Sequence, residues 1–328
     1  MSLAIFVKLL ALVAVVAIGY VVGRAGWLSP DRKDADPART LSYAAFYIFV
    51  PALLFRTTAR LDLQALPWRI LIAFFLPVGV AMIGVYVWQR HWNRKQRLPA
   101  AAPSARAMSA GFGNTVQVGI PMAAALFGEA GLAIHITLVS LHALSLLTLM
   151  TTIVELDLAR EQVKASGSAD LWATLRTTVH NTVIHPVLLP VVAGMLWNFT
   201  GWPLPDVVDE LLQMLGQAVV PLCLVLIGIS LAYYGIGKAV RSGLILSAVK
   251  LLVFPLLVLC FARWGLGLTG IPLAVVVMAA ALPVGSNALI FAQRYNTLQS
   301  EASTAILVST VAFAVTAPLW LLILAWVG

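Results

Sequence analysis

The sequence predicts an all-helical integral membrane protein with ten membrane-spanning helices. Of its 328 residues, 61% are hydrophobic and only 10% are charged, whereas charged residues make up about a quarter of a soluble domain. Apolar stretches of about 20 residues, each long enough to cross a hydrocarbon core of about 30 Å, recur from one end of the chain to the other. Short polar or basic segments separate them. A water-facing surface cannot be built from this composition.

The apolar stretches divide into two sets of five. We expect helices near residues 3–22, 41–55, 70–88, 107–127 and 130–153 in the first half, and near 177–199, 211–234, 240–261, 270–293 and 302–327 in the second. The first stretch lacks a small-residue cleavage pattern, so it is predicted to be a retained helix rather than a cleaved signal peptide. The longest polar break predicts three parts: a five-helix unit (residues 1–154), a flexible cytoplasmic linker (155–176) and a second five-helix unit (177–328).

The distribution of basic residues predicts the orientation, because Lys and Arg favour the cytoplasmic ends of membrane helices. One set of alternate loops holds 15 Lys and Arg residues and the opposite set holds 4. Both termini are therefore predicted on the periplasmic side. Five helices per half then place the two halves upside down relative to each other. Since the basic residues lie in short runs between apolar segments, the net charge of +8 indicates topology and not a nucleic-acid partner.

Three motifs of the first half return in the same order in the second half. They are a glycine followed seven residues later by Gly-Trp, a short apolar run around a proline, and a cluster of Gly, Pro and Asn in the fourth helix of each half. The pairs are Gly19 to Trp27 with Gly194 to Trp202, Phe49 to Leu54 with Val219 to Leu224, and Gly113 to Pro121 with Pro283 to Asn287. The order of the pairs favours an inverted repeat.

The two Gly, Pro and Asn clusters are predicted to break their helices near the middle of the membrane. A proline inside a helix removes a backbone hydrogen bond and clashes with the preceding turn. Freed backbone groups are tolerated at that depth only where they are buried in protein or line a cavity, and paired interrupted helices indicate a transporter's substrate site. A simple kink is the alternative at either proline alone. The candidate substrate-binding residues are Asn114, Gln117, Pro121, Pro283, Ser286 and Asn287.

These motifs resemble those of the auxin efflux carrier family. The stretch from Gly113 to Leu132, the histidine-bearing stretch that follows it, and the stretch from Ala280 to Asn296 are similar to that family's fourth and ninth helices. The resemblance covers nearly the whole chain. It implies the fold of the PIN proteins and bile acid sodium symporters, with two inverted five-helix repeats, a scaffold, a mobile transport domain that moves like an elevator, and two broken helices crossing at the substrate. The short linker favours a bacterial inner-membrane permease over the plant members.

The chemistry of the predicted site favours an anion. No Asp or Glu lies between Asp62 and Glu129 or between Glu210 and Glu301, so neither broken helix carries a carboxylate. A small organic anion, such as a carboxylate, would meet amide and hydroxyl donors and the positive N-terminal ends of half-helices. Two ionisable residues inside the predicted membrane segments, His142 and Lys250, are candidates for substrate contact or coupling, with structural hydrogen bonding as the alternative.

Two other functions are weighed against a carrier. An anion channel would need a continuous pore, which the sequence does not distinguish well from an occluded site. An intramembrane enzyme would need a catalytic motif, and neither His-Glu-x-x-His nor Gly-x-Ser-x-Gly occurs. We expect no cofactor and no metal site. Dicarboxylates and monocarboxylates, import and export, coupling to protons or Na⁺, and a monomer or a homodimer all remain open.

Overall fold

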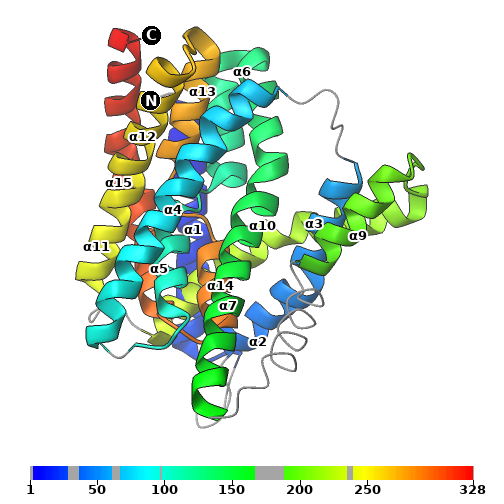
Figure 1. The fold of residues 1–328 in the computed structure, drawn as a ribbon, viewed down its shortest axis with the longest axis vertical. Coiled ribbons are helices and arrows are strands. Elements are labelled where there is room, and N and C mark those ends of the chain that lie inside the picture. Colours follow the sequence, from blue (N-terminus) through cyan, green and yellow to red (C-terminus); the bar gives the residue numbers. More distant parts are fainter. Residues whose placement is uncertain are drawn as a thin grey trace.

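The structure, a computed structural model, describes residues 3–28, 37–60, 67–96, 98–166, 188–234 and 239–327. These residues form helices joined by short connections, together with one isolated β-bridge between Gly113 and Val284 (Figure 1). The predicted all-helical class is confirmed. Residues 167–187, which include the beginning of the sixth predicted helix and His185, lie outside the described residues, so the ten-helix count stays a prediction.

The described part of the first half contains seven α-helices and three π-helical turns, which are labelled η. In chain order they are α1 (Leu3–Ala25), α2 (Pro37–Ala44), η1 (Ala45–Phe49), α3 (Val50–Ala59), α4 (Trp68–Gln96), α5 (Ala102–Gly111), η2 (Thr115–Gly119), α6 (Ile120–His142), η3 (Ala143–Leu147) and α7 (Thr148–Ser166). Within α6, Gly128 has a φ of 63° and separates two helical parts. The fourth and fifth predicted helices meet at this glycine.

The described part of the second half is also helical. Its elements are α9 (Leu188–Phe199), α10 (Asp206–Tyr234), α11 (Val240–Ala248), η4 (Val249–Val253), α12 (Phe254–Cys260), η5 (Phe261–Gly265), α13 (Gly270–Ala281), α14 (Asn287–Arg294) and α15 (Gln299–Val327). Five helical runs in the described residues are long and apolar enough to cross a membrane: Trp68–Trp92, Met122–Glu161, Asp206–Ile229, Val240–Gly265 and Gln299–Val327. Four shorter apolar helices accompany them.

Three of the π-helical turns share a cause in the sequence. Each of η1, η2 and η4 ends two residues before a proline, namely Pro51, Pro121 and Pro255. A proline offers no N–H and its ring clashes with the carbonyl four residues earlier, so the preceding turn widens to the π spacing. The turn before Pro121 is widened and not broken. The predicted cluster, Gly113 to Pro121, does interrupt its helix, but near its beginning and not at the proline. The break in that helix lies earlier, at residues 112–114.

The α7 helix extends into the segment that was predicted to be a flexible linker. It continues to Ser166, so residues 155–166 are helical. The carboxylate of Asp157 joins this part of α7 to α4, since it accepts hydrogen bonds from Tyr86 (2.6 Å) and Arg90 (2.5 Å) on α4 and from Arg160 (3.1 Å) on its own helix. The linker prediction was wrong for these residues, and residues 167–176 lie outside the described ones.

Glycines bring helices from the two halves into close contact. The α1 helix packs along α10, where a Cβ added to Gly19 would lie 2.2 Å from the carbonyl oxygen of Val225, and one added to Gly228 would lie 2.0 Å from that of Val16. The α3 and α9 helices also pack together (Figure 1). Small residues at such contacts allow the backbones of membrane helices to approach closely.

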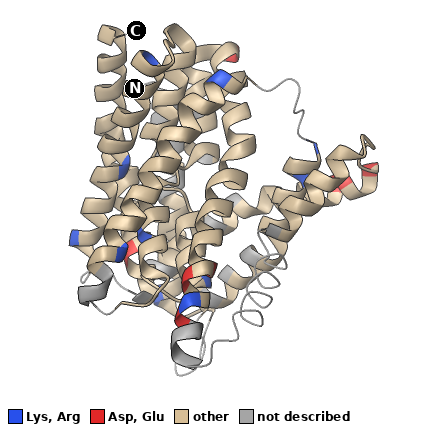
Figure 2. Ribbon diagram, viewed as in Figure 1, with Lys and Arg blue, Asp and Glu red and all other residues tan. Residues whose placement is uncertain are grey.

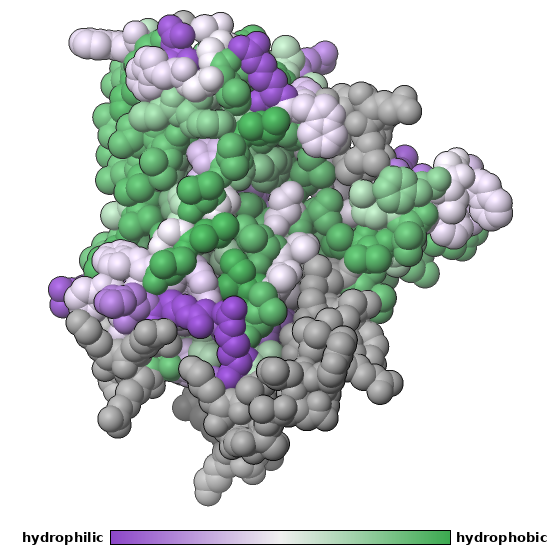
Figure 3. Space-filling view, viewed as in Figure 1, coloured by the Kyte–Doolittle hydropathy of each residue, from purple (hydrophilic) through white to green (hydrophobic). Residues whose placement is uncertain are grey.

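The surface has the distribution expected for a protein in a bilayer. Most of the Lys, Arg, Asp and Glu residues lie towards the ends of the helices (Figure 2). A broad hydrophobic band covers the middle of the visible face, with hydrophilic residues above and below it (Figure 3). The band has the character of lipid-facing surface, since so broad an apolar surface is unfavourable in water.

Candidate functional site

Two interrupted helices meet at their breaks. The first interruption lies between α5 and η2, and the second between α13 and α14. The backbone N–H of Asn114 donates to the carbonyl oxygen of Pro283 (2.8 Å), and that of Gly285 donates to the carbonyl oxygen of Phe112 (2.9 Å). A Cβ on Gly285 would lie 2.7 Å from the carbonyl oxygen of Gly113. The crossing therefore satisfies backbone groups that the breaks release, and it requires glycine at position 285.

Two side chains from other helical segments support the breaks. His135 on α6 is buried, and its Nε2 lies 2.8 Å from the carbonyl oxygen of Thr115 in the first turn after the first break. Ser309 on α15 is buried too, and its Oγ accepts a hydrogen bond of 3.0 Å from the backbone N–H of Val284 in the second break. Each break is thus held by the opposite break and by a neighbouring helix.

The half-helix ends with partial positive charge and those with partial negative charge face different groups. The N-terminal ends of η2 and α14, at Thr115 and Asn287, line a cavity. The C-terminal end of α13 points instead to Lys250, whose Nζ donates to the carbonyl oxygen of Ala280 (2.5 Å). Free N–H groups give a helix N-terminus a partial positive charge, and free carbonyl groups give the C-terminus a partial negative one. The positive ends therefore face the cavity and a negative end faces the lysine.

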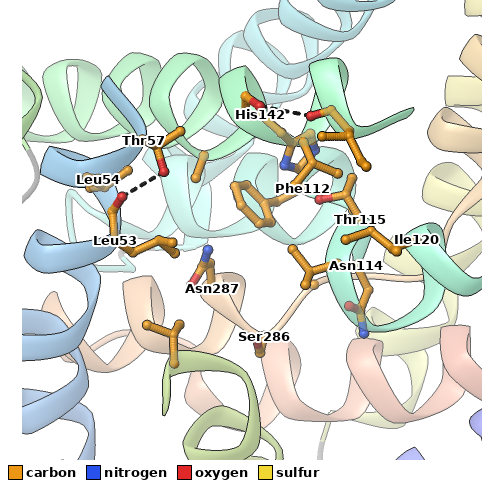
Figure 4. A pocket seen from close by; sticks show the side chains of 18 residues that line it. Leu53, Leu54, Thr57, Phe112, Asn114, Thr115, Ile120, His142, Ser286 and Asn287 are labelled. Carbon is orange, nitrogen blue, oxygen red and sulfur yellow. Dashed lines mark hydrogen bonds between the residues drawn. The ribbon is translucent and has the colours of Figure 1, made fainter. Parts of the chain in front are cut away.

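The cavity has a volume of about 200 Å³ and lies beside the crossing (Figure 4). Its polar part is formed by the two breaks, with Asn114, Ser286 and Asn287. In Figure 4 the amide nitrogen of Asn287 points towards the space between Leu53 and Phe112. The remaining wall comes from other elements: Leu53, Leu54 and Thr57 on α3, Val219 on α10, and Ile136, Val139, Ser140 and His142 on α6.

The cavity carries no fixed charge on its lining. Of the 18 residues that line it, none is Asp, Glu, Lys or Arg, and His142 is the single histidine. The amide oxygens of Asn114 and Asn287 are buried without a hydrogen-bond partner among the described residues. Within the same residues, no three His, Cys, Asp or Glu side chains gather as a metal site would require. The polar groups available to a ligand are therefore amides, hydroxyls, an imidazole and backbone N–H groups.

The structure brings together some of the predicted site residues. Asn114, Ser286 and Asn287 line the cavity, while Pro283 contributes its carbonyl oxygen to the crossing. The side chains of Gln117 and Pro121 lie outside the described part of the structure. The backbone places both in the first turns after the break. The prediction therefore identified three lining residues and one residue of the crossing.

The two ionisable candidates have different positions. His142 lines the cavity, and its ring packs against Phe112 with a centroid distance of 4.4 Å. Its Nε2 has no partner among the described residues. Lys250 is buried and does not line the cavity. It lies behind the first break, where a Cβ added to Gly113 would be 3.5 Å from Nζ. His142 can contact a ligand in the cavity, whereas Lys250 can act on such a ligand only through long-range electrostatics.

Sequence reasoning missed four residues at the site. His135 lies seven positions before His142, two helical turns away, which is a signal that the sequence contained. Leu53 and Thr57 belong to the helix that carries the repeated proline motif, but nothing in that motif marks them as cavity residues. Ser309 is one of several hydroxyl residues in its helix, and only the tertiary structure selects it.

Comparisons with known proteins identify the family of the chain. A family model described as "Membrane transport protein" matches residues 4–321. The chain is 24% identical over 318 residues to an uncharacterized transporter of Methanothermobacter thermautotrophicus, covering 96% of this chain and 97% of that protein. It is 28% identical over 148 residues to a Rhizobium meliloti protein whose name proposes malonate transport, covering 44% and 46%. It is 22% identical over 233 residues to auxin efflux carrier component 8 of Arabidopsis thaliana, covering 59% and 63%. The chain therefore belongs to the membrane transport protein family, which is the auxin efflux carrier family that its motifs resemble.

Proposed function

We propose that this protein is a secondary transporter that carries a small organic anion, a carboxylate, bound in the cavity at the crossing of the two broken helices. The observation that carries the proposal is the arrangement of the two half-helix N-termini, at Thr115 and Asn287, on a cavity whose lining holds no carboxylate. A helix N-terminus favours an anion because its free N–H groups and its dipole act together.

The amide side chains supply donors to a carboxylate. Rotation of an Asn amide by 180° exchanges its oxygen and its two N–H donors. Asn114 and Asn287 can therefore each present donors to a ligand, and they come from opposite breaks. The hydroxyl of Ser286 adds a further donor beside Asn287. A carboxylate with two oxygens would be matched by donors from both breaks.

Lys250 supports the anion from a distance. Its ammonium group is buried, and it has no carboxylate partner among the described residues. In a low-dielectric interior an uncompensated positive charge acts over several ångströms. A bound anion in the neighbouring cavity would offset this charge, so the lysine favours binding of an anion without touching it.

The cavity lies between two groups of packed helices, as alternating access requires. One wall belongs to α3 and α10, which pack with each other and with α9 and α1. The other walls belong to the breaks and to α6, which pack mainly with α4, α13 and α15. The two groups contact each other where α10 meets α15 and where α1 meets α6. We propose that the first group is the scaffold and that the second moves as the transport domain of two inverted repeats in a bacterial inner membrane.

The test is transport by purified protein in liposomes. Radiolabelled mono- and dicarboxylates of up to about ten heavy atoms would be supplied outside liposomes loaded with the same unlabelled compound. We expect saturable uptake that is accelerated by the internal compound, since a carrier exchanges substrate across the membrane. Uptake that rises linearly with concentration and shows no acceleration would indicate a channel and would contradict the proposal. Replacing Na⁺ with K⁺, and changing the pH on one side, would reveal the coupling ion.

A further inference from the structure

A second cavity lies at one end of the helical bundle, where α4 ends and where α5 and α11 begin. It is formed by the last turns of α4, the beginning of α5 and the beginning of α11, and it has a volume of about 410 Å³. Its lining residues are Trp88, Gln89, Trp92, Arg106, Arg241, Ser242, Ile245 and Leu246. None of them lines the cavity at the crossing, so the two cavities are separate.

The two arginines of this cavity differ in their hydrogen bonds and ion pairs. Arg106 is already bound, since its guanidinium donates to both carboxylate oxygens of Glu301 (2.9 and 3.0 Å) and to the side chain of Gln89 (2.9 Å). Arg241 is exposed and has no hydrogen bond or ion pair with the described residues. A guanidinium presents several N–H donors in one plane, and this arrangement matches a phosphate group.

The rest of the cavity and its rim are apolar or aromatic. Trp88 and Trp92 are 55% and 46% exposed, and Ile245 is 48% exposed. Tryptophan is enriched where a membrane helix passes the lipid headgroups. In Figure 3 the hydrophilic surface at the lower left, over the ends of α4 and α11 in Figure 1, directly borders the green hydrophobic band. A ligand in this cavity would therefore have both a charged part and an acyl part.

We propose that this cavity binds the headgroup of an anionic phospholipid, with the phosphate at Arg241 and the acyl chains along the exposed apolar faces of α4 and α11. Charge complementarity favours an anionic lipid over a zwitterionic one, because the cavity offers a cation, Arg241, that has no ion-pair partner among the described residues, and Glu301 is already neutralised by Arg106. Basic pockets between helices at the side of the membrane rich in Lys and Arg are suited to such headgroups. The apolar rim favours a lipid over a free anion.

The test measures lipid binding, so it is independent of transport. The wild-type protein, purified in a neutral detergent, would be heated with phosphatidylglycerol, with phosphatidylcholine, or with inorganic phosphate. We expect phosphatidylglycerol to raise the unfolding temperature by several degrees, and the other two to raise it by much less. Native mass spectrometry of the same samples should show one tightly held phosphatidylglycerol.

The variants Arg241→Gln and Arg263→Gln test whether the lipid binds at this cavity or is attracted to any basic side chain of the protein. Arg263 lies in η5, and its Nε donates to the backbone oxygen of Val327 (3.1 Å), so its replacement removes the same charge away from the cavity. Arg241→Gln should lose most of the rise in unfolding temperature and the retained lipid, and Arg263→Gln should keep both. An equal rise in the two variants would overturn the proposal, and so would an equal rise with inorganic phosphate, which would indicate a site for soluble anions.

Discussion

The backbone N–H of Asn114 donates a 2.8 Å hydrogen bond to the carbonyl oxygen of Pro283, and this bond joins two helices that are both interrupted. Backbone groups released by a helix break are costly in a membrane interior. Here the backbone groups of each break bond those of the other, and the amide oxygens of Asn114 and Asn287 have no hydrogen-bond partner among the described residues. The geometry of the crossing therefore controls the geometry of the candidate site.

The first prediction tests the crossing itself. In Gly285→Ala, the added Cβ would lie 2.7 Å from the carbonyl oxygen of Gly113 and 2.9 Å from the ring of Phe112. Relief of this overlap must separate the breaks, so we expect strongly reduced transport and a destabilisation of about 1–3 kcal/mol. The matched control is Gly84→Ala on α4, because a Cβ there meets nothing within 4 Å. Equal transport by the two variants would show that close approach at position 285 is not required.

The second prediction concerns the sign of the charge at the cavity. Asn287→Asp keeps the size of the side chain but places a negative charge at the N-terminus of α14. Repulsion should abolish binding of an anion, while the helix N-terminus tolerates the new carboxylate and the protein stays folded. Asn296→Asp, at an exposed position after α14, is the control and should transport normally. Undiminished uptake by Asn287→Asp would remove Asn287 from the substrate site.

The third prediction tests whether both breaks contact one ligand. Asn114→Ala and Asn287→Ala should each weaken substrate binding by about 1–3 kcal/mol, because each leaves a buried polar group of the substrate unsatisfied. The double variant should lose less than the sum if the two amides hold the same carboxylate. Isothermal titration on folded protein measures all three. Full affinity in Asn114→Ala would leave the second break as the binding element.

The fourth prediction separates the electrostatic role of Lys250 from a structural one. Lys250→Met has a similar volume and removes a buried charge, so stability should be unchanged or should rise by about 1–4 kcal/mol. Affinity for the anion should fall by about tenfold or more, since the offsetting charge is gone. Thermal unfolding and substrate binding are measured on the same preparation. A loss of stability with unchanged affinity would assign the lysine to the bond with Ala280 alone.

The fifth prediction concerns topology. The excess of Lys and Arg in one set of loops, 15 against 4, predicts that the C-terminus lies on the periplasmic side. Alkaline phosphatase fused to the C-terminus should be active in bacterial cells, and green fluorescent protein fused at the same point should not fluoresce. The reverse result would place the C-terminus in the cytoplasm and would contradict either the predicted orientation or the ten-helix count. A fusion to the N-terminus distinguishes the two, because an odd number of helices places the termini on opposite sides.

The sequence was sufficient for the class of protein and for which two helices are interrupted. Its low charge content and repeated apolar stretches determine a membrane helix bundle, because no other solvent matches that surface. The paired clusters around Asn114 and Asn287 indicated the interrupted helices, since glycine, proline and polar side chains together weaken a helix in that environment. The residues at the polar end of the cavity could therefore be named without a structure.

The tertiary structure decided which groups face one another. The sequence did not indicate that Pro121 would widen its helix while residues 112–114 break it, because that outcome depends on hydrogen bonds from the opposite break. It also did not separate His142, which lines the cavity, from Lys250, which lies behind it. Both are single polar residues in apolar helices, and local sequence carries no information on which neighbour a helix face will meet. Long-range packing between the two halves determines the site, and it exists only once the chain has folded.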